Sequence, residues 1–65
     1  MDHLLTPSEV ADYLRRPEKT LAMWRYRHIG PPYVKLAGGH VRYRRSAVEK
    51  WIDAQSVSTS AHGLA

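Results

Sequence analysis

Residues 5 to 32 read LTPSEVADYLRRPEKTLAMWRYRHIGPP and contain the start and stop signals of two successive helices. Thr6 suits the N-cap of a helix, Pro7 suits the first helical position, and Glu9, three residues after Thr6, completes a capping box. Leu5 and Val10 occupy the two positions of a hydrophobic staple. The stretch therefore predicts a helix from Pro7 to about residue 14, whose buried face comprises Val10, Ala11 and Leu14.

A second helix is predicted from about Pro17 to His28. Pro17 pushes Arg16 out of helical dihedral angles but can itself begin a helix, and Gly30 is placed to end that helix. Pro31 and Pro32 then prevent any continuation. A link of only two or three residues is typical of a helix-turn-helix. Helical spacing puts Leu21 and Trp24 on the core side of this helix, with His28 between them. Both large apolar residues are expected to pack against Val10, Leu14 and Trp51.

A two-stranded hairpin, or wing, is predicted next, from the β-favouring runs Tyr33–Leu36 and Val41–Tyr43. The intervening Ala37-Gly38-Gly39-His40 supplies the positive φ angles of a tight turn. Alternation puts Val41 and Tyr43 on one face of the wing and puts Arg42 and Arg44 on the other.

A third helix follows the wing. Ser46 and Glu49 have the spacing of a second capping box, and the helix is expected to end near Gln55. Its buried stripe would comprise Val48, Trp51 and Ile52. The predicted fold is mainly α with a small β-hairpin, a winged helix-turn-helix formed by residues 1–55 as one domain. Residues 56–65 are mostly Ser, Ala, Thr and Gly and are expected to form a flexible C-terminal tail.

The composition limits the classes of function. Without cysteine the chain has neither disulfides nor thiolate metal sites. It contains no long apolar run and no signal pattern, so we expect a soluble protein of the bacterial cytoplasm, associated with the nucleoid. The four histidines are scattered and the carboxylates show no catalytic pairing, so neither an enzyme nor a metal or cofactor site is expected.

The charge is concentrated in the middle of the chain. Residues 15–45 hold nine cationic residues and one acidic residue, a net charge of +8, whereas the other 34 residues hold one lysine and five acidic residues, a net charge of −4. A basic middle of this kind is what phosphate binding needs, and a solvated basic surface is the plainer alternative. Binding to a membrane is less favoured, because no apolar helix face lies opposite these charges.

The outward side of the second helix is centred on Lys19, Ala22, Met23 and Tyr26, with Thr20, Arg25 and Arg27 on its flanks. Small and apolar groups can meet a thymine methyl, lysine can reach guanine acceptors, and arginines can bind phosphates. In the wing and just after it, the predicted DNA-binding residues are Lys35, Gly39, His40, Arg42, Arg44 and Arg45. Two alternatives remain open: a protein-contact patch at the exposed Met23 and Tyr26, and wing charges that only prevent edge aggregation.

These residues resemble a known family. The runs KTLAMW (residues 19–24), GPPYVK (30–35) and VRYRRSAV (41–48), with Trp51, are similar to the excisionases, small phage-type winged-helix proteins akin in plan to MerR-like regulators and AlpA-like activators. The resemblance implies a recombination directionality factor that binds and bends attachment-site DNA and directs a tyrosine or serine integrase toward excision. It implies groove contacts by Lys19, Thr20, Met23 and Tyr26, and wing contacts by Gly39, His40 and Arg42.

Ala22 and Met23 depart from this resemblance, because the family commonly has charged residues there, which leaves the base preference different or weaker. A single module of this size has a small footprint on DNA, typically about 600–1,000 Å². We therefore expect several copies to bind head-to-tail and cooperatively. Two further hypotheses remain: an AlpA-like transcription regulator, and a protein-interaction module that has the same fold but no role on DNA.

Overall fold

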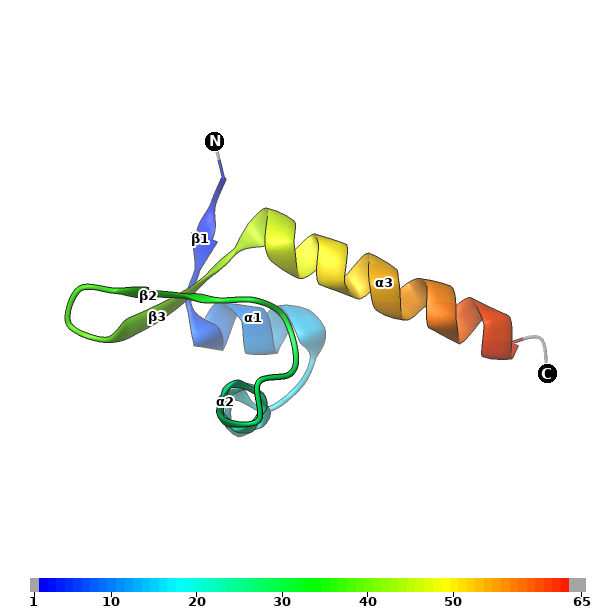
Figure 1. The fold of residues 1–65 in the computed structure, drawn as a ribbon, viewed down its shortest axis with the longest axis horizontal. Helices are drawn as coiled ribbons and strands as arrows, with labels where there is room; N and C mark the ends of the chain where they lie inside the picture. Colours follow the sequence, from blue (N-terminus) through cyan, green and yellow to red (C-terminus); the bar gives the residue numbers. More distant parts are fainter. Residues whose placement is uncertain (1, 64–65) are drawn as a thin grey trace.

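The computed structural model describes the backbone of residues 2–63 and the side chains of residues 2–55. The elements follow the order β1 (Leu4–Leu5), α1 (Pro7–Leu14), α2 (Glu18–Tyr26), β2 (Val34–Leu36), β3 (His40–Arg44) and α3 (Arg45–Gly63) (Figure 1). The hairpin of β2 and β3 projects to one side of α1 and α2, and α3 projects to the other. This arrangement of three helices and a small antiparallel sheet confirms the predicted fold class, a winged helix-turn-helix.

Helix α1 begins and ends where the sequence predicts. Glu9 N donates to Thr6 Oγ1 at 3.1 Å and Thr6 N donates to Glu9 Oε1 at 2.9 Å, so both halves of the capping box are present. Beyond the helix, Arg15 takes the left-handed conformation with φ 57°, and Arg16 N donates to Ala11 O at 2.9 Å. This Schellman-type ending satisfies carbonyls that the last turn would leave free.

Helix α2 is shorter than the predicted span of Pro17 to His28. Pro17 is its N-cap, with an extended backbone, and the last helical residue is Tyr26. His28 takes the left-handed conformation with φ 58°, and Ile29 N donates to Trp24 O at 2.9 Å. His28 therefore ends the helix in place of Gly30, and its side chain is exposed rather than on the core side.

Gly30 serves packing against a side chain. Its φ is 85°, and a Cβ built on it would lie 2.7 Å from Cε3 of Trp24. Only glycine lets the backbone pass this close to the indole ring. Pro31 follows and is buried, so the chain turns from α2 toward β2 directly over Trp24.

The sheet contains one more strand than the sequence predicts. Its order is β1-β3-β2, with β1 antiparallel to β3 through Leu4↔Arg44 and Leu5↔Tyr43. The wing itself is the predicted hairpin, with β2 beginning one residue later, at Val34, and β3 one residue longer at each end. A two-residue strand without β-branched side chains has no local signature, because only pairing with β3 defines it.

Helix α3 begins directly at the end of β3, and its cap differs from the prediction. Ser46 lies inside the helix, and its backbone N and its Oγ donate to the Asp2 carboxylate at 3.2 Å and 2.9 Å. Glu49 instead accepts from Arg45 Nε at 3.0 Å. The second capping box is thus wrong: the end of the helix is satisfied by an acidic residue 44 positions earlier in the chain.

Helix α3 continues to Gly63, beyond the predicted end near Gln55. The sequence between them holds no proline or glycine, so nothing local stops a helix whose first turns are packed. Side chains from Ser56 onward lie outside those described. The flexibility expected of residues 56–65 stays a prediction.

The core lies between α1, α2, the sheet and the start of α3. Its buried members are Val10, Ala11, Leu21, Tyr43 and Val48, and the half-buried residues around it include Leu14, Trp24 and Ile52. The rings of Trp24 and Trp51 lie 5.5 Å apart between centroids, which confirms the predicted contact between α2 and α3. Tyr43, only 1% exposed, is the largest fully buried side chain. It belongs to the same core cluster as Val10 and Ala11 of α1, and its hydroxyl accepts a hydrogen bond from Arg25 of α2.

Candidate nucleic-acid interface

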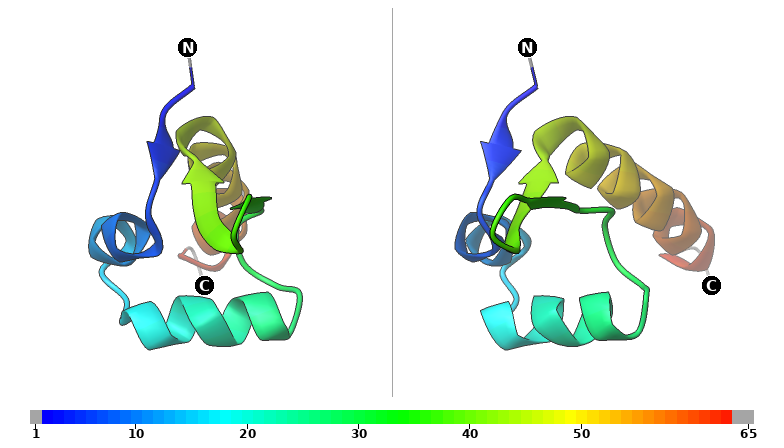
Figure 2. Two further views of the ribbon diagram at one scale, coloured as in Figure 1. Left: turned by 90° about the vertical axis from the view of Figure 1, so that its left-hand side faces the viewer. Right: turned by 60° about the vertical axis from the view of Figure 1, so that its left-hand side comes forward.

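Helix α2 exposes one continuous stripe of side chains. Lys19, Ala22, Met23 and Tyr26 follow the spacing i, i+3, i+4 and i+7, and all four are exposed, Met23 by 47% and Tyr26 by 86%. Leu21, on the other side, is completely buried. Figure 2 shows α2 running below the rest of the molecule, with one long side free. Its outward face is the one that the sequence predicts.

The flanks of this stripe differ from each other. Arg27, just after α2, is exposed, and Thr20 is half-buried. Arg25 is half-buried: its Nη1 donates to the Tyr43 hydroxyl at 2.8 Å, and its guanidinium lies 5.9 Å from the centroid of the Tyr33 ring. Arg25 therefore connects α2 to the sheet, and its predicted contact with phosphate stays a prediction.

The wing carries a tip without bulky side chains. Gly38 and Gly39 have φ angles of 87° and 83°, and Gly39 N closes the turn by donating to Leu36 O at 2.9 Å. A Cβ at Gly39 would meet nothing within 4 Å, so the tip is open to a close approach from outside. His40 follows at the start of β3 and is exposed.

The cations of the wing lie on two faces. Arg42 pairs with Val34, and Arg44 pairs with Leu4, on the face away from Tyr43, as the alternation predicts. Lys35 pairs with Val41 and so lies on the other face, together with Tyr43.

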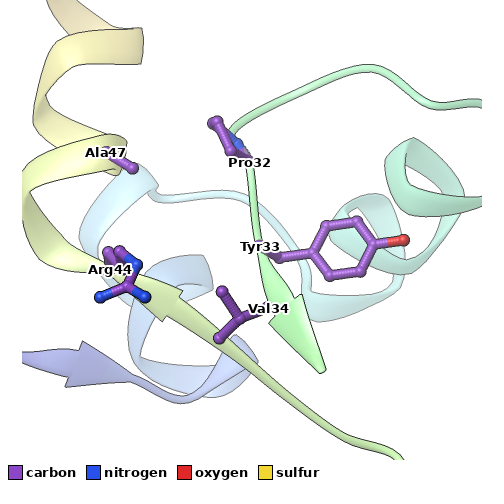
Figure 3. Close-up of a pocket in the computed structure, with 5 residues that line it drawn as sticks. All are labelled: Pro32, Tyr33, Val34, Arg44 and Ala47. Atoms are coloured by element: carbon purple, nitrogen blue, oxygen red, sulfur yellow. The ribbon is translucent and has the colours of Figure 1, made fainter. Parts of the chain in front are cut away.

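The two faces also differ in what surrounds them. In Figure 3, the Tyr33 ring turns toward α2, whereas Arg44 lies with Val34 on the side of α3. A small depression between them is lined by Pro32, Tyr33, Val34, Arg44 and Ala47. Arg42 Nη1 donates to Val41 O at 2.8 Å.

The predicted site residues are therefore not brought into one patch. The stripe of α2 shares its side of the sheet with Arg25 and Lys35, while Arg42 and Arg44 lie across the sheet, and Arg45 is paired with Glu49 on α3. The projecting hairpin carries cations of both groups, and its tip is open. Two exposed apolar residues near α2 were not predicted, Ile29 and Tyr33, at 52% and 37% exposure. Periodicity could not identify them, because both lie outside regular helices and strands.

Other kinds of site are not found in the described part of the chain. No group of three or more histidine or acidic side chains could hold a metal ion there. Within the same residues, no helix has the length and apolar character needed to span a bilayer.

Comparison with known proteins gives one match. The family described as "Helix-turn-helix domain" matches residues 4–56. This span runs from β1 through α1, α2, β2 and β3 into the first part of α3. No curated protein and no solved structure matches the chain. With most of its length matched, and with α1 and α2 joined by the short turn typical of that motif, the chain belongs to the helix-turn-helix domain family of DNA-binding proteins.

Proposed function

We propose that this protein is an excisionase-type DNA-binding factor, which inserts α2 into the major groove of a duplex and rests its wing on the adjacent backbone or minor groove. The observation that carries the proposal is the exposed stripe of α2 beside a projecting wing whose tip is open. The width of the major groove admits an α-helix, and glycines at the tip permit close approach to the backbone.

The residues divide into two roles. Lys19, Met23 and Tyr26 would face base edges, because they lie along the free side of α2. The exposed cations near them and on the wing would neutralise phosphates; they are Arg27, Lys35 and Arg44, together with the half-buried Arg42. Arg25 acts by holding α2 against the sheet, and Arg45 is engaged with Glu49.

The excisionase role rests on the resemblance of residues 19–24, 30–35 and 41–48 to that family. In this role the protein bends attachment-site DNA and, with an integrase, favours excision. A module with one short recognition helix makes few base contacts, so we propose that copies bind head-to-tail on adjacent sites. The exposed acidic residues Asp12 on α1 and Asp53 on α3 would meet a neighbour's wing, whereas Glu9 and Glu49 already accept hydrogen bonds within the chain.

An integrase recombination assay on attachment-site DNA, with and without the protein, tests the role directly. We expect the protein to raise the yield of excision and lower that of integration. Specific duplex binding without any effect on either reaction would contradict the excisionase role and favour a transcription regulator.

Gel-shift titrations on duplexes that carry one, two or three sites test the cooperativity. Affinity per site should rise with the number of sites, and a constant affinity per site would contradict head-to-tail binding. Binding that is insensitive to salt would contradict DNA binding through phosphates altogether.

A further inference from the structure

The exposed side of α2 is short of hydrogen-bonding groups for bases. At its centre Ala22 and Met23 carry no donor or acceptor that could read a base edge, and Met23 is 47% exposed. Lys19 stands at one end of the stripe and Tyr26, 86% exposed, stands at the other. Apolar side chains exposed in this way carry an unfavourable free energy of hydration, and contact with an apolar group of a partner would remove it.

The arginine that could supply base recognition is already engaged. Arg25 donates to the hydroxyl of Tyr43, which is itself 1% exposed, and its guanidinium lies over the Tyr33 ring, 5.9 Å from the ring centroid. Releasing Arg25 to bind guanine would leave the Tyr43 hydroxyl without this partner. One nitrogen of the Arg25 guanidinium is thus committed to Tyr43, and the side chain lies against the sheet rather than along the exposed stripe, so the bidentate contact between arginine and guanine is disfavoured from this position.

Within the major groove, the only apolar group on a base edge is the thymine 5-methyl. Resting on the proposed DNA binding, we infer that Ala22 and Met23 read thymine methyl groups, and that the protein selects sites with adjacent thymines under the middle of α2. The stripe from Lys19 to Tyr26 is about 10 Å long, since each helical residue rises about 1.5 Å. That length covers about three base-pair steps of about 3.4 Å. Ala22 and Met23 rise only about 1.5 Å from each other at the middle of the stripe, but they point about 100° apart around the helix, so they can reach neighbouring bases.

The cations around the stripe favour DNA over a protein as its partner. Lys19 and Arg27 are exposed at its two ends, and Lys35 lies on the same side of the sheet. Positive charges that surround an apolar strip match a groove floor of methyl groups between two walls of phosphates. An apolar protein partner would gain nothing from these charges.

The test removes only the methyl groups. The full chain first selects its preferred site from duplexes of random sequence, and we expect two neighbouring thymines to be enriched. Each is then replaced by deoxyuridine, which keeps every hydrogen-bonding group. We expect a roughly fourfold loss of affinity per methyl, because burial of one such group is worth about 0.8 kcal/mol and tenfold corresponds to about 1.4 kcal/mol.

Two variants assign the effect to α2. Met23→Gln keeps the length of the side chain and a good helix former but offers an amide, so discrimination between thymine and deoxyuridine should disappear at one position, with adenine favoured there instead. The matched control is Tyr13→Gln, a polar replacement of an apolar residue that is 52% exposed on α1. This control should keep the full discrimination of the original chain.

The outcomes separate this inference from the proposed function. Salt-sensitive binding with equal affinity for thymine and deoxyuridine duplexes, or selection of sites without enriched thymine, overturns the thymine inference and leaves the DNA-binding function standing. Equal affinity combined with an altered oligomeric state of Met23→Gln in sedimentation velocity would show a protein-contact patch instead. No binding to any duplex would overturn both the inference and the proposed function.

Discussion

His28 and Arg15 hold the left-handed positions that end α2 and α1, with φ angles of 58° and 57°. This conformation is natural for glycine, whereas a residue with a Cβ pays roughly 1 kcal/mol or more. Neither position carries the usual glycine, so the left-handed conformation itself could not be predicted, although the end of α1 near residue 14 could. Because Gly30 lies two residues after His28, the sequence predicts that α2 extends to His28, whereas the helix ends at Tyr26.

His28→Gly should stabilise the protein. Relief of the left-handed strain outweighs the added freedom of the unfolded chain, so the free energy of unfolding should rise by about 0.5 kcal/mol. Thermal unfolding followed by circular dichroism should show an increase of a few degrees in Tm, as about 1 kcal/mol shifts a domain of this size by about 4–8 °C. His28→Ala is the control and should give no increase; a lower Tm for His28→Gly would contradict the assigned ending.

Gly30 and Gly39 form a matched pair for separating conformation from packing. Their φ angles are 85° and 83°, but a Cβ at Gly30 would collide with Trp24, whereas one at Gly39 meets nothing within 4 Å. We expect Gly39→Ala to lower the free energy of unfolding by about 1 kcal/mol. Gly30→Ala should lower it by about 2–4 kcal/mol, because overpacking adds to the same strain. Equal losses in urea titrations would show that Trp24 does not pack against Gly30.

The N-terminal segment, residues 2–5, holds the end of β3 and the start of α3 in place. β1 pairs with β3, Arg45 N donates to His3 O at 2.8 Å, and Ser46 donates twice to the Asp2 carboxylate. The hydrogen bond from the Ser46 backbone, followed by that from its hydroxyl, holds the pKa of Asp2 below its ordinary value of 3.8. A carboxyl whose pKa is lower in the folded state stabilises above its unfolded pKa, and this stabilisation is lost as the pH falls through the folded value.

Asp2→Asn should therefore lower Tm near neutral pH and have a fading effect in acid. The difference in Tm between the original chain and the variant should be constant above about pH 5, and should shrink to nothing as the pH falls below 3.8. Using the difference between the two proteins cancels the titration of the remaining carboxylates. A difference that stays constant down to pH 2 would contradict a role for the charged carboxylate at this end of α3.

Elements with local signals could be predicted from the sequence, and elements defined by distant partners could not. The capping box of Thr6 and Glu9 fixes the start of α1, and the paired glycines fix the hairpin turn. By contrast, β1 exists through pairing with β3, and the cap of α3 comes from Asp2. Ser46 and Glu49 have the spacing of a capping box, but a strand that leads directly into the helix leaves Ser46 inside it.

At the scale of the whole molecule, the free side of α2 could be predicted and the grouping of the charges could not. A helical wheel separates Met23 from Leu21, and the structure confirms that separation. Sequence alone does not give the pairing register, which puts Lys35 and Arg42 on opposite faces of the wing. Nor does it show that Arg25 binds Tyr43, eighteen residues away. The basic middle of the chain thus forms two faces joined at the wing, and a duplex would have to contact the projecting hairpin to use both.

Replacing cations at different places tests this division. Arg42→Ala on the wing should reduce the slope of log affinity against log salt by about 0.9, the contribution of one phosphate contact. Lys50→Ala, which removes an exposed cation from α3, should leave the slope unchanged. Filter-binding or fluorescence-anisotropy titrations at several salt concentrations measure both slopes. Equal reductions would show that the protein's charge acts without regard to its position.

Contact of one duplex with both α2 and the wing can be followed by NMR titration of the isotope-labelled chain with a duplex short enough to hold a single copy. We predict shifts of the backbone amide signals concentrated in residues 19–29 and 35–42, with little change in residues 8–13 of α1 and 49–53 of α3. Shifts confined to α1 and α3, with α2 and the wing unaffected, would show that DNA does not contact the recognition helix or the hairpin.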